Sequence, residues 1–271
     1  MNPLVHYLRT GQAEGRSIQK RAAVYCAITG GYDRLRPPIS PDPNLDYIAF
    51  AEDFVPVPDP WIRSNIPRRY VDNRRTSRFF KTHAHTLLPG YDISMWLDGA
   101  FQLRNLNAEN LHLALGRADI AFFRHDLRDC AYEEAEVVSK NGLDSPESVA
   151  RTVKQLEANG YPRGAGMVAA GLVVQRHKSQ VLMDAMEEWW QMILNGSQRD
   201  QLSINFVLWK HKIPYAVIPG VVRRNKWVYW MGHEPATWSD VKRWSQFLEN
   251  EILDLQSAIE APKKPDGARE S

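Results

Sequence analysis

Short apolar segments alternate with amphipathic helical patterns along this chain, and this alternation constrains the fold more than any other feature. The clearest apolar segments, AAVYCAI and ISMWL, are short and lack helical spacing, which is typical of buried strands. The clearest helical pattern covers residues 178–194, where apolar side chains recur every three or four positions. Strands separated by helices predict an α/β fold, with a mostly parallel, Rossmann-type sheet flanked by helices on both faces.

The alternation runs through residues 21–235, which we predict to form a single domain. Residues 1–20 are polar and predict a partly ordered lead-in. Residues 236–261 carry a further helical pattern, and the charged residues 262–271 predict a disordered tail. We therefore expect one domain with short appendages at both ends.

The composition favours a cytoplasmic protein. Hydrophobic residues make up 44% of the chain and charged residues 24%, as in ordinary globular proteins, and no apolar window is long enough to span a membrane. The N-terminus has no signal-peptide pattern, and Cys26 and Cys130 lack metal-ligand spacing, so we expect two reduced thiols. The net charge of +2 and the lack of a nucleic-acid-binding motif give no support to a nucleic-acid partner.

A carboxylate follows one of the predicted central strands. Residues 93–97 are apolar except for one serine, and Asp98 and Gly99 come directly after them. An aspartate there lies at the sheet edge where α/β folds bind ligands, and a glycine lets a large group approach the backbone. Two interpretations remain open: Asp98 contacts a metal and a diphosphate, or it caps a turn after a core strand.

The loop after the first predicted strand reads Thr29-Gly30-Gly31-Tyr32-Asp33. Its two glycines allow backbone N–H groups to face a nucleotide, and Asp33 can accept a hydrogen bond from a sugar or base hydroxyl. The loop is not a GxGxxG sequence, so a dinucleotide fingerprint is not supported. A plain Gly-Gly turn is the alternative interpretation.

A cationic stripe marks the helix that we predict over residues 73–88. Arg74, Arg78, Lys81 and His85 are spaced by four, three and four residues, which places them on one helix face. These cations have no acidic partners one turn away, so they repel one another unless an anion binds them. The stripe is either a solvated face or a site for an anion such as a diphosphate.

Two further ionisable groups lie near predicted element ends. His125 follows the apolar segment 118–123, where a lone histidine is more often a structural hydrogen-bond donor than a catalyst. Asp200 lies in the first turn of a helix that we predict over residues 197–210, where the helix dipole favours a carboxylate.

Seven motifs together, in order from Val24 to about Lys210, resemble the glycosyltransferase-like domain of plant mucilage and pollen-turgor proteins, the TOD/MUCI type, which has bacterial members. Each motif is weak alone, and their order and spacing carry the resemblance. They are AITGGYD at 27–33, DYIAF at 46–50, R-x-x-K-x-x-x-H at 78–85, YDISMWLDG at 91–99, H-x-x-R-x-C-x-Y-x-E at 125–134, GLVVQRH at 171–177 and RDQLS at 199–203.

The resemblance implies a GT-A-like fold, a nucleotide-sugar donor and a divalent metal, Mn²⁺ or Mg²⁺, that bridges the donor diphosphate. In such enzymes a strand-end Asp-x-Asp binds the metal. Asp98 matches the first carboxylate, whereas the second position is Ala100. We expect His233 to complete the metal site, or else the Arg74, Arg78 and Lys81 stripe to neutralise most of the diphosphate charge.

The resemblance further implies that Asp200 and Gln201 lie near the transferred sugar. Asp200 would stabilise a cationic sugar centre, orient the acceptor, or act as general base. The expected catalytic residues are thus Asp98, His125 and Asp200, and the expected substrate-binding residues are Arg128, Glu134 and Gln201.

The predicted activity is transfer of a sugar from a nucleoside diphosphate to a glycan or another hydroxyl acceptor. Two alternatives remain. One is a lipid-amide hydrolase, an activity attributed within the family, although no Gly-x-Ser-x-Gly, zinc-protease helix or Cys/His cluster supports it. The other is a non-catalytic carbohydrate-binding protein, which Ala100 would favour.

Overall fold

The structure is a computed structural model that describes residues 22–66, 70, 72–234, 252–253 and 256. The predictions for residues 1–20, 236–251 and 262–271 lie outside the described residues.

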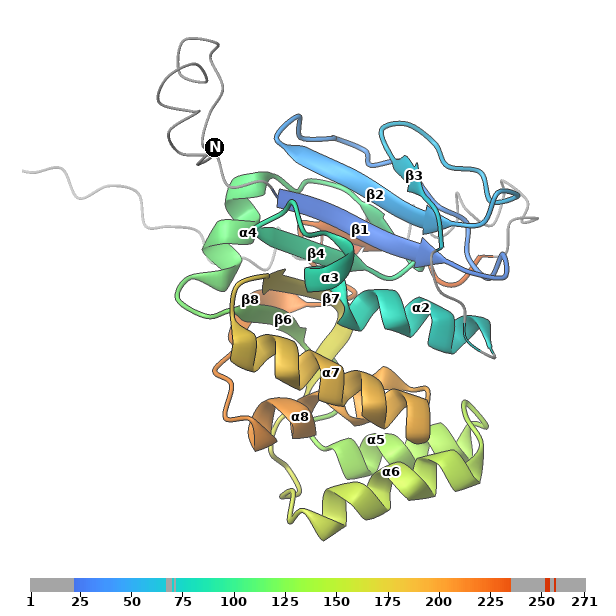
Figure 1. Cartoon of the computed structure of the whole chain (residues 1–271), viewed down its shortest axis with the longest axis vertical. Helices are drawn as coiled ribbons and strands as arrows, with labels where there is room; N and C mark the ends of the chain where they lie inside the picture. Colours follow the sequence, from blue (N-terminus) through green and yellow to red (C-terminus); the bar gives the residue numbers. More distant parts are fainter. Residues whose placement is uncertain (1–21, 67–69, 71, 235–251, 254–255, 257–271) are drawn as a thin grey trace, which may run out of the picture.

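A seven-stranded sheet forms the centre of the domain, in the strand order β3-β2-β1-β4-β7-β6-β8 (Figure 1). Among the described strands of this sheet, β7 alone is antiparallel to the others, so the predicted mostly parallel sheet is confirmed. The strands are β1 (Ala22–Ile28), β2 (Leu45–Ala51), β3 (Ile62–Ser64), β4 (Ile93–Leu97), β6 (Ile120–Arg124), β7 (Val168–Arg176) and β8 (Ala216–Val221).

Both faces of the sheet are covered, as the sequence predicts. One face packs against a layer of helices in which aromatic residues such as Phe80 and Trp189 are fully buried. This layer contains α2 (Asn73–Thr82), α7 (Gln180–Asn195) and α8 (Ile204–Lys210), with α5 (Ala131–Lys140) and α6 (Pro146–Ala158) beyond them.

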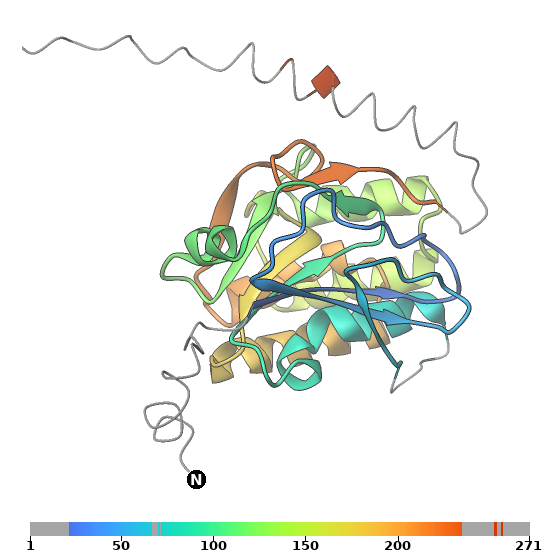
Figure 2. The same cartoon turned by 90° about the horizontal axis from the view of Figure 1, so that it is seen from above.

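The opposite face carries α4 (Ala108–Leu115) and a two-stranded sheet formed by β5 (Phe101–Leu103) and β9 (Val228–Trp230). Figure 2 shows this small sheet across the central sheet from α2 and α7. The sequence did not predict β5 because a three-residue strand is too short to show periodicity.

Two predicted helices are each divided in the structure. The helix predicted over residues 73–88 stops at His83 and restarts as the single turn α3 (Ala84–Leu87), because His83 leaves helical geometry at φ −114°, ψ 27°. The helix predicted over residues 197–210 begins as a 3₁₀ turn, η2 (Asp200–Leu202), and continues as α8. Both divisions lie close to residues of the candidate site.

The order of the strands creates a crevice beside β1. The chain passes from β1 to β2 and β3 on one side and then returns to form β4 on the other side of β1. The connections after β1 and β4 therefore diverge at the carboxyl ends of these two strands. This topological switch point is where open α/β sheets bind their ligands.

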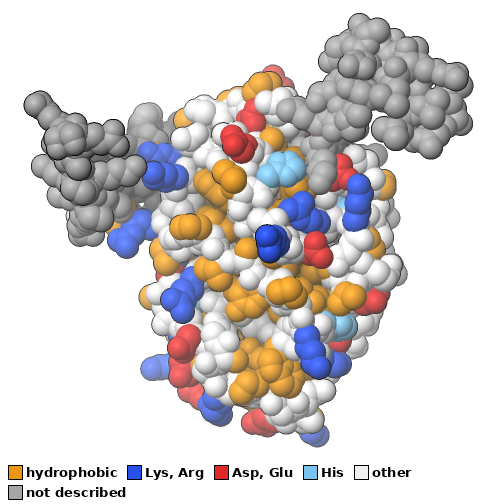
Figure 3. Space-filling view, turned by 90° about the vertical axis from the view of Figure 1, so that its left-hand side faces the viewer, with side chains coloured by type: hydrophobic (Ala, Val, Ile, Leu, Met, Phe, Trp, Pro, Cys, Tyr) orange, Lys and Arg blue, Asp and Glu red, His pale blue; other side chains and the backbone are white. Residues whose placement is uncertain are grey.

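None of the helices in the described part of the chain is long and apolar enough to cross a membrane. On the face shown in Figure 3, basic and acidic side chains are interspersed with hydrophobic ones.

Candidate active site at the switch point

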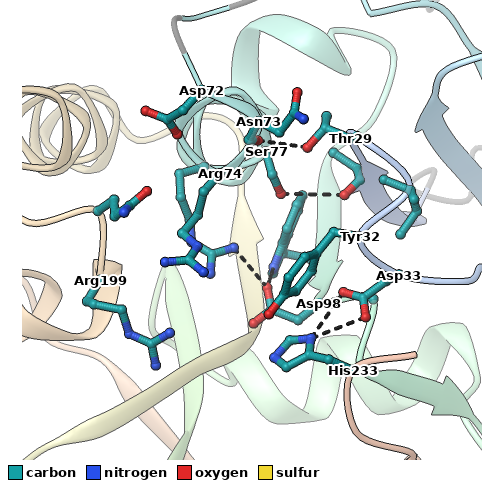
Figure 4. Close-up of a pocket in the computed structure, with 17 residues that line it drawn as sticks. Thr29, Tyr32, Asp33, Asp72, Asn73, Arg74, Ser77, Asp98, Arg199 and His233 are labelled. Carbon is teal, nitrogen blue, oxygen red and sulfur yellow. Dashed lines mark hydrogen bonds and ion pairs between the residues drawn. The ribbon is translucent and has the colours of Figure 1, made fainter. Parts of the chain in front are cut away.

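A cavity of about 370 Å³ opens at the carboxyl ends of β1 and β4 (Figure 4). Its walls are the loop after β1, the first half of α2, the end of β4 and the segment before η2. The lining includes seven of the residues predicted for the site: Thr29, Gly30, Asp33, Arg74, Arg78, Asp98 and His233. Residues more than two hundred positions apart in the sequence, such as Thr29 and His233, thus meet at the switch point.

The start of α2 is fixed against the end of β1. The Asp72 carboxylate caps the helix by accepting from the Arg75 backbone N–H at 2.6 Å. The Thr29 hydroxyl donates to the Asn73 carbonyl at 2.7 Å. These bonds aim the predicted cationic stripe at the strand ends, except for His85, which lies on α3 and stacks near His83.

Two cations of the stripe form an ion-pair quartet with two carboxylates. Lys81 Nζ lies 3.0 Å from Asp98 Oδ1 and 2.5 Å from Asp200 Oδ2. Arg78 lies 3.6 Å from Asp98 Oδ1 through a terminal nitrogen and 3.1 Å from Asp200 Oδ2 through Nε. The solvated-face interpretation is therefore wrong for Lys81, whose side chain is fully buried.

Opposite charges in the quartet shift the pKa values of Asp200 and Arg78 toward their charged forms. Burial alone would raise the pKa of Asp200, but Arg78 and Lys81 lower this pKa to about 2. Burial alone would lower the pKa of Arg78, but Asp200 and Asp98 raise it. A carboxylate with such a low pKa is a weak base, so Asp200 suits the role of a permanent anion better than that of a general base.

Asp98 is held in place by donors on one of its oxygens. Trp96 Nε1 donates to Asp98 Oδ1 at 2.6 Å, and Arg78 and Lys81 reach the same oxygen. The Asp98 backbone N–H donates to the Gly171 carbonyl at 2.9 Å, which ties the end of β4 to β7. Among the described residues, the Asp98 side chain contacts Arg78, Lys81 and Trp96, and it does not contact the backbone of a turn.

The loop after β1 differs from the prediction that its backbone N–H groups face a nucleotide. Gly30 and Gly31 adopt φ values of 65° and 62°, which favour glycine. The Gly30 N–H, however, donates to a carboxylate oxygen of Glu52 at 2.6 Å and is not open to a ligand. Gly31 is absent from the lining of the cavity. Thr29, Tyr32 and Asp33 are therefore the side chains of the loop placed to contact a ligand.

Asp33 packs against the glycine that follows Asp98. A Cβ atom on Gly99 would lie 2.6 Å from Asp33 Cβ and 2.8 Å from Asp33 Oδ2. The sequence predicts that a large group approaches the backbone at Gly99, and in the structure this group is the Asp33 side chain. Asp33 also lies 3.2 Å from His233 Nδ1 through each of its oxygens.

His233 owes its position to a buried ion pair next to it. Glu234 pairs with Arg36, and both side chains are almost completely buried. Arg36 also donates to the Gly99 carbonyl at 2.9 Å, so one guanidinium links the end of β4 to the chain after β9. No sequence pattern indicates this pair, because its members lie 198 positions apart.

The residues present do not form a metal site by themselves. In the part of the chain that the structure describes, no group of three or more His, Cys, Asp or Glu side chains could hold a metal ion. The His233 imidazole faces Asp33 and not Asp98, and Asp98 Oδ1 is taken by two cations and an indole N–H. Ala100 is buried and provides no ligand.

Other predicted site residues lie apart from the cavity. His125 Nδ1 accepts from the Arg128 backbone N–H at 3.1 Å, and the Arg128 side chain pairs with the buried Glu134. This arrangement fixes the β6–α5 connection. The His125 ring nitrogen accepts hydrogen bonds here, whereas the structural interpretation expects it to donate. Gln201 bonds to the β7 backbone at Val168 and Ala170, so its amide holds the strand.

Sequence reasoning missed several polar residues that line the cavity: Tyr32, Asn73, Ser77, Gln198 and Arg199. The sequence contains a signal for Arg199, because this residue directly precedes Asp200 in the RDQLS motif. Figure 4 shows it at the end of the cavity away from Asp33 and His233.

Residues 62–225 match the family described as TOD1/MUCI70, glycosyltransferase-like domain. The chain belongs to this family. The matched region of the TOD1/MUCI70 family contains α2, Asp98 and Asp200, whereas the loop after β1 and His233 lie outside it. The strand order confirms the predicted α/β class with a mostly parallel sheet, and the family match confirms a glycosyltransferase-like domain.

Two solved structures with low sequence identity are also similar to this TOD1/MUCI70 domain. One is titled WbbM bifunctional glycosyltransferase in the apo form, with 12% identity and a TM-score of 0.45; the match covers 86% of this chain and 44% of that one. The other is mouse xyloside xylosyltransferase 1, also apo, with 11% identity and a TM-score of 0.44, covering 73% of this chain and 84% of that one. This chain thus spans less than half the length of the first. A search of curated proteins found no match.

Proposed function

We propose that the chain is a glycosyltransferase that uses a nucleoside diphosphate sugar as donor and a glycan or another hydroxyl compound as acceptor. The observation that carries the proposal is the cavity at the β1–β4 switch point, with Arg78 and Asp98 in its wall, in a glycosyltransferase-like domain. Glycosyl transfer requires a site that stabilises the departing diphosphate, whose charge increases as the bond to the sugar breaks.

Arg78 is the group best suited to that task. Its guanidinium lines the cavity and is held in position by Asp98 and Asp200 before any ligand arrives. A pre-positioned cation loses little freedom when it binds an anion, which makes it effective at a transition state. Lys81, buried below Arg78, fixes the two carboxylates and is a positioning residue in this account.

The remaining groups suit the other parts of such a substrate. Thr29, Tyr32 and Asp33 would contact the nucleoside, since a hydroxyl, an exposed aromatic ring and a carboxylate suit a ribose and a base. Asp200, whose pKa lies near 2, would remain an anion and stabilise positive charge that develops on the sugar.

The test is a thermal-shift screen of nucleotide sugars that differ in base and sugar, each with and without Mn²⁺, followed by chromatography of the released nucleoside diphosphate. The proposal expects stabilisation by one base class and slow release of its diphosphate. Lipid amides and free oligosaccharides serve as the arms for hydrolase and for non-catalytic binding.

Arg78→Gln should lose the nucleotide effect, whereas Arg151→Gln, a change at an exposed arginine of α6, should retain it. Stabilisation by lipid amides alone, or an Arg78→Gln protein that responds like the wild type, would contradict the proposal.

A further inference from the structure

The charges around the cavity bear on how a diphosphate would be held. Arg78, Lys81, Asp98 and Asp200 balance one another, with two positive and two negative groups in mutual contact. A divalent cation added at Asp98 would lie beside a lysine and an arginine that already share its Oδ1 oxygen. Like charges so close together repel, and the repulsion is strong where water is scarce.

Two further arginines line the cavity and form no ion pair with a carboxylate among the described residues, although Arg199 helps to lower the pKa of Asp200. Among the described residues, neither Arg74 nor Arg199 lies within ion-pair distance of an acidic side chain, and Arg74 makes one hydrogen bond, of 3.3 Å, to the Leu143 carbonyl. Arg199 Nε is shielded from solvent and has no hydrogen-bond partner among those residues. A buried N–H without a partner is costly, and an anionic oxygen would satisfy it.

Arg78 has unused hydrogen-bonding capacity as well. Its Nε lies 3.1 Å from Asp200 Oδ2, but the N–H does not point at that oxygen, so the atom has no hydrogen-bond partner among the described residues. Arginine carries five N–H donors in a planar fork that matches phosphate oxygens. Arg74, Arg78 and Arg199 therefore offer donors from two separate segments, α2 and the residue before η2.

The charge count favours an anion over a cation at this place. The quartet is neutral, and Asp72 is paired with Arg75. Asp33 adds one negative charge, which His233 balances only when it is protonated. Arg74 and Arg199 add two positive charges, so the cavity stays positive. A nucleoside diphosphate carries about two to three negative charges at pH 7, which this positive charge partly neutralises.

We propose that the chain binds the diphosphate of its donor without a divalent metal, through Arg74, Arg78 and Arg199. The inference rests on the proposed function. Arg199 and Arg74 take the place of the metal that a second strand-end carboxylate would have held, and Ala100 is consistent with its loss. Asp98 then serves to orient Arg78 and Lys81, through the contacts described above.

The experiment is isothermal titration calorimetry of the whole chain with UDP, GDP, ADP, CDP and dTDP, first in EDTA and then with Mn²⁺ or Mg²⁺. We expect one of these diphosphates to bind in EDTA, with a dissociation constant within threefold of that measured with metal. Each charge-assisted hydrogen bond contributes roughly 1.5–3 kcal/mol, so Arg199→Gln should weaken binding by about 10- to 100-fold.

Arg199→Lys keeps the charge but loses the fork and should lie between the wild type and Arg199→Gln. Arg151→Gln is the matched control and should bind like the wild type. If Arg199→Gln fails to fold by circular dichroism, Arg74→Gln, whose side chain is only half-buried, provides the same test.

Each outcome has one reading. Binding that requires Mn²⁺ or Mg²⁺ would overturn the inference while leaving the proposed function in place, and so would metal-free binding that Arg199→Gln and Arg74→Gln both leave unchanged. If no diphosphate binds under either condition, the proposed function itself fails.

Discussion

The substitution Asp200→Asn tests whether the ion-pair quartet holds the site together. The change removes one of two carboxylates that neutralise Arg78 and the fully buried Lys81, and it leaves the quartet with a net positive charge. Removing one partner of a buried ion pair costs about 3–5 kcal/mol. Lys81 keeps Asp98 at 3.0 Å, so we expect a loss of about 3 kcal/mol in the free energy of unfolding.

The pKa of Asp200 gives a second figure for the same contacts. A decrease from 3.8 to about 2 corresponds to roughly 2 kcal/mol of stabilisation of the folded state by the ionised carboxylate. A lowered carboxyl pKa stabilises the fold above the unfolded value, near pH 4, and this stabilisation is lost as the pH falls toward 2. The difference between wild type and variant should therefore be full at pH 7 and shrink below pH 4.

The assay is urea unfolding followed by circular dichroism at pH 7 and at intervals down to pH 3. Asp92→Asn is the matched control, because Asp92 pairs with Lys178, whose side chain is 80% exposed. Such a pair contributes about 0–1 kcal/mol. An Asp200→Asn protein as stable as the control at pH 7 would refute the account of the quartet.

Three further predictions concern the supports of the site. Gly99→Ala places a Cβ 2.6 Å from Asp33 Cβ, and differential scanning calorimetry should show a loss of about 1–3 kcal/mol; an unchanged melting temperature would contradict the packing. Glu234→Gln leaves Arg36 buried without its counter-charge and should cost about 3–5 kcal/mol in urea unfolding, more than Glu109→Gln at an exposed position of α4. Burial lowers the pKa of His177 from 6.5 to about 4, so the folded protein keeps this histidine neutral. The free energy of unfolding should therefore fall by about 3 kcal/mol as the pH falls from 6.5 to 4. His177→Asn should flatten the urea-unfolding profile over that range.

The fold could be predicted from the sequence where the periodic pattern was long. The strand at 22–28 and the helix at 180–195 each bury a continuous apolar set, so their type follows from spacing alone. The small sheet could not be predicted, because β5 and β9 have three residues each and depend on a partner far along the chain. The break at His83 could not be predicted from spacing. There the His83 ring stacks on Phe79 of the same helix and bonds to Glu187 of α7, far along the chain.

The site could be predicted where a residue type and a strand end coincide, as at Asp98, or where spacing shows a helix face, as for Arg74 and Arg78. What the sequence could not provide was the partner of each group. Lys81 holds Asp98 and Asp200 in place, because its buried ammonium group forms an ion pair with each of them. Only the folded chain reveals which pairs are satisfied and which arginines remain available.

The most direct test of the central claim is a crystal structure of the chain with the nucleoside diphosphate that binds it best, grown in EDTA. The account predicts the diphosphate in the cavity at the ends of β1 and β4, with its oxygens within hydrogen-bond distance of Arg78 and of Arg74 or Arg199. A diphosphate bound elsewhere, or one that contacts none of these arginines, would contradict it.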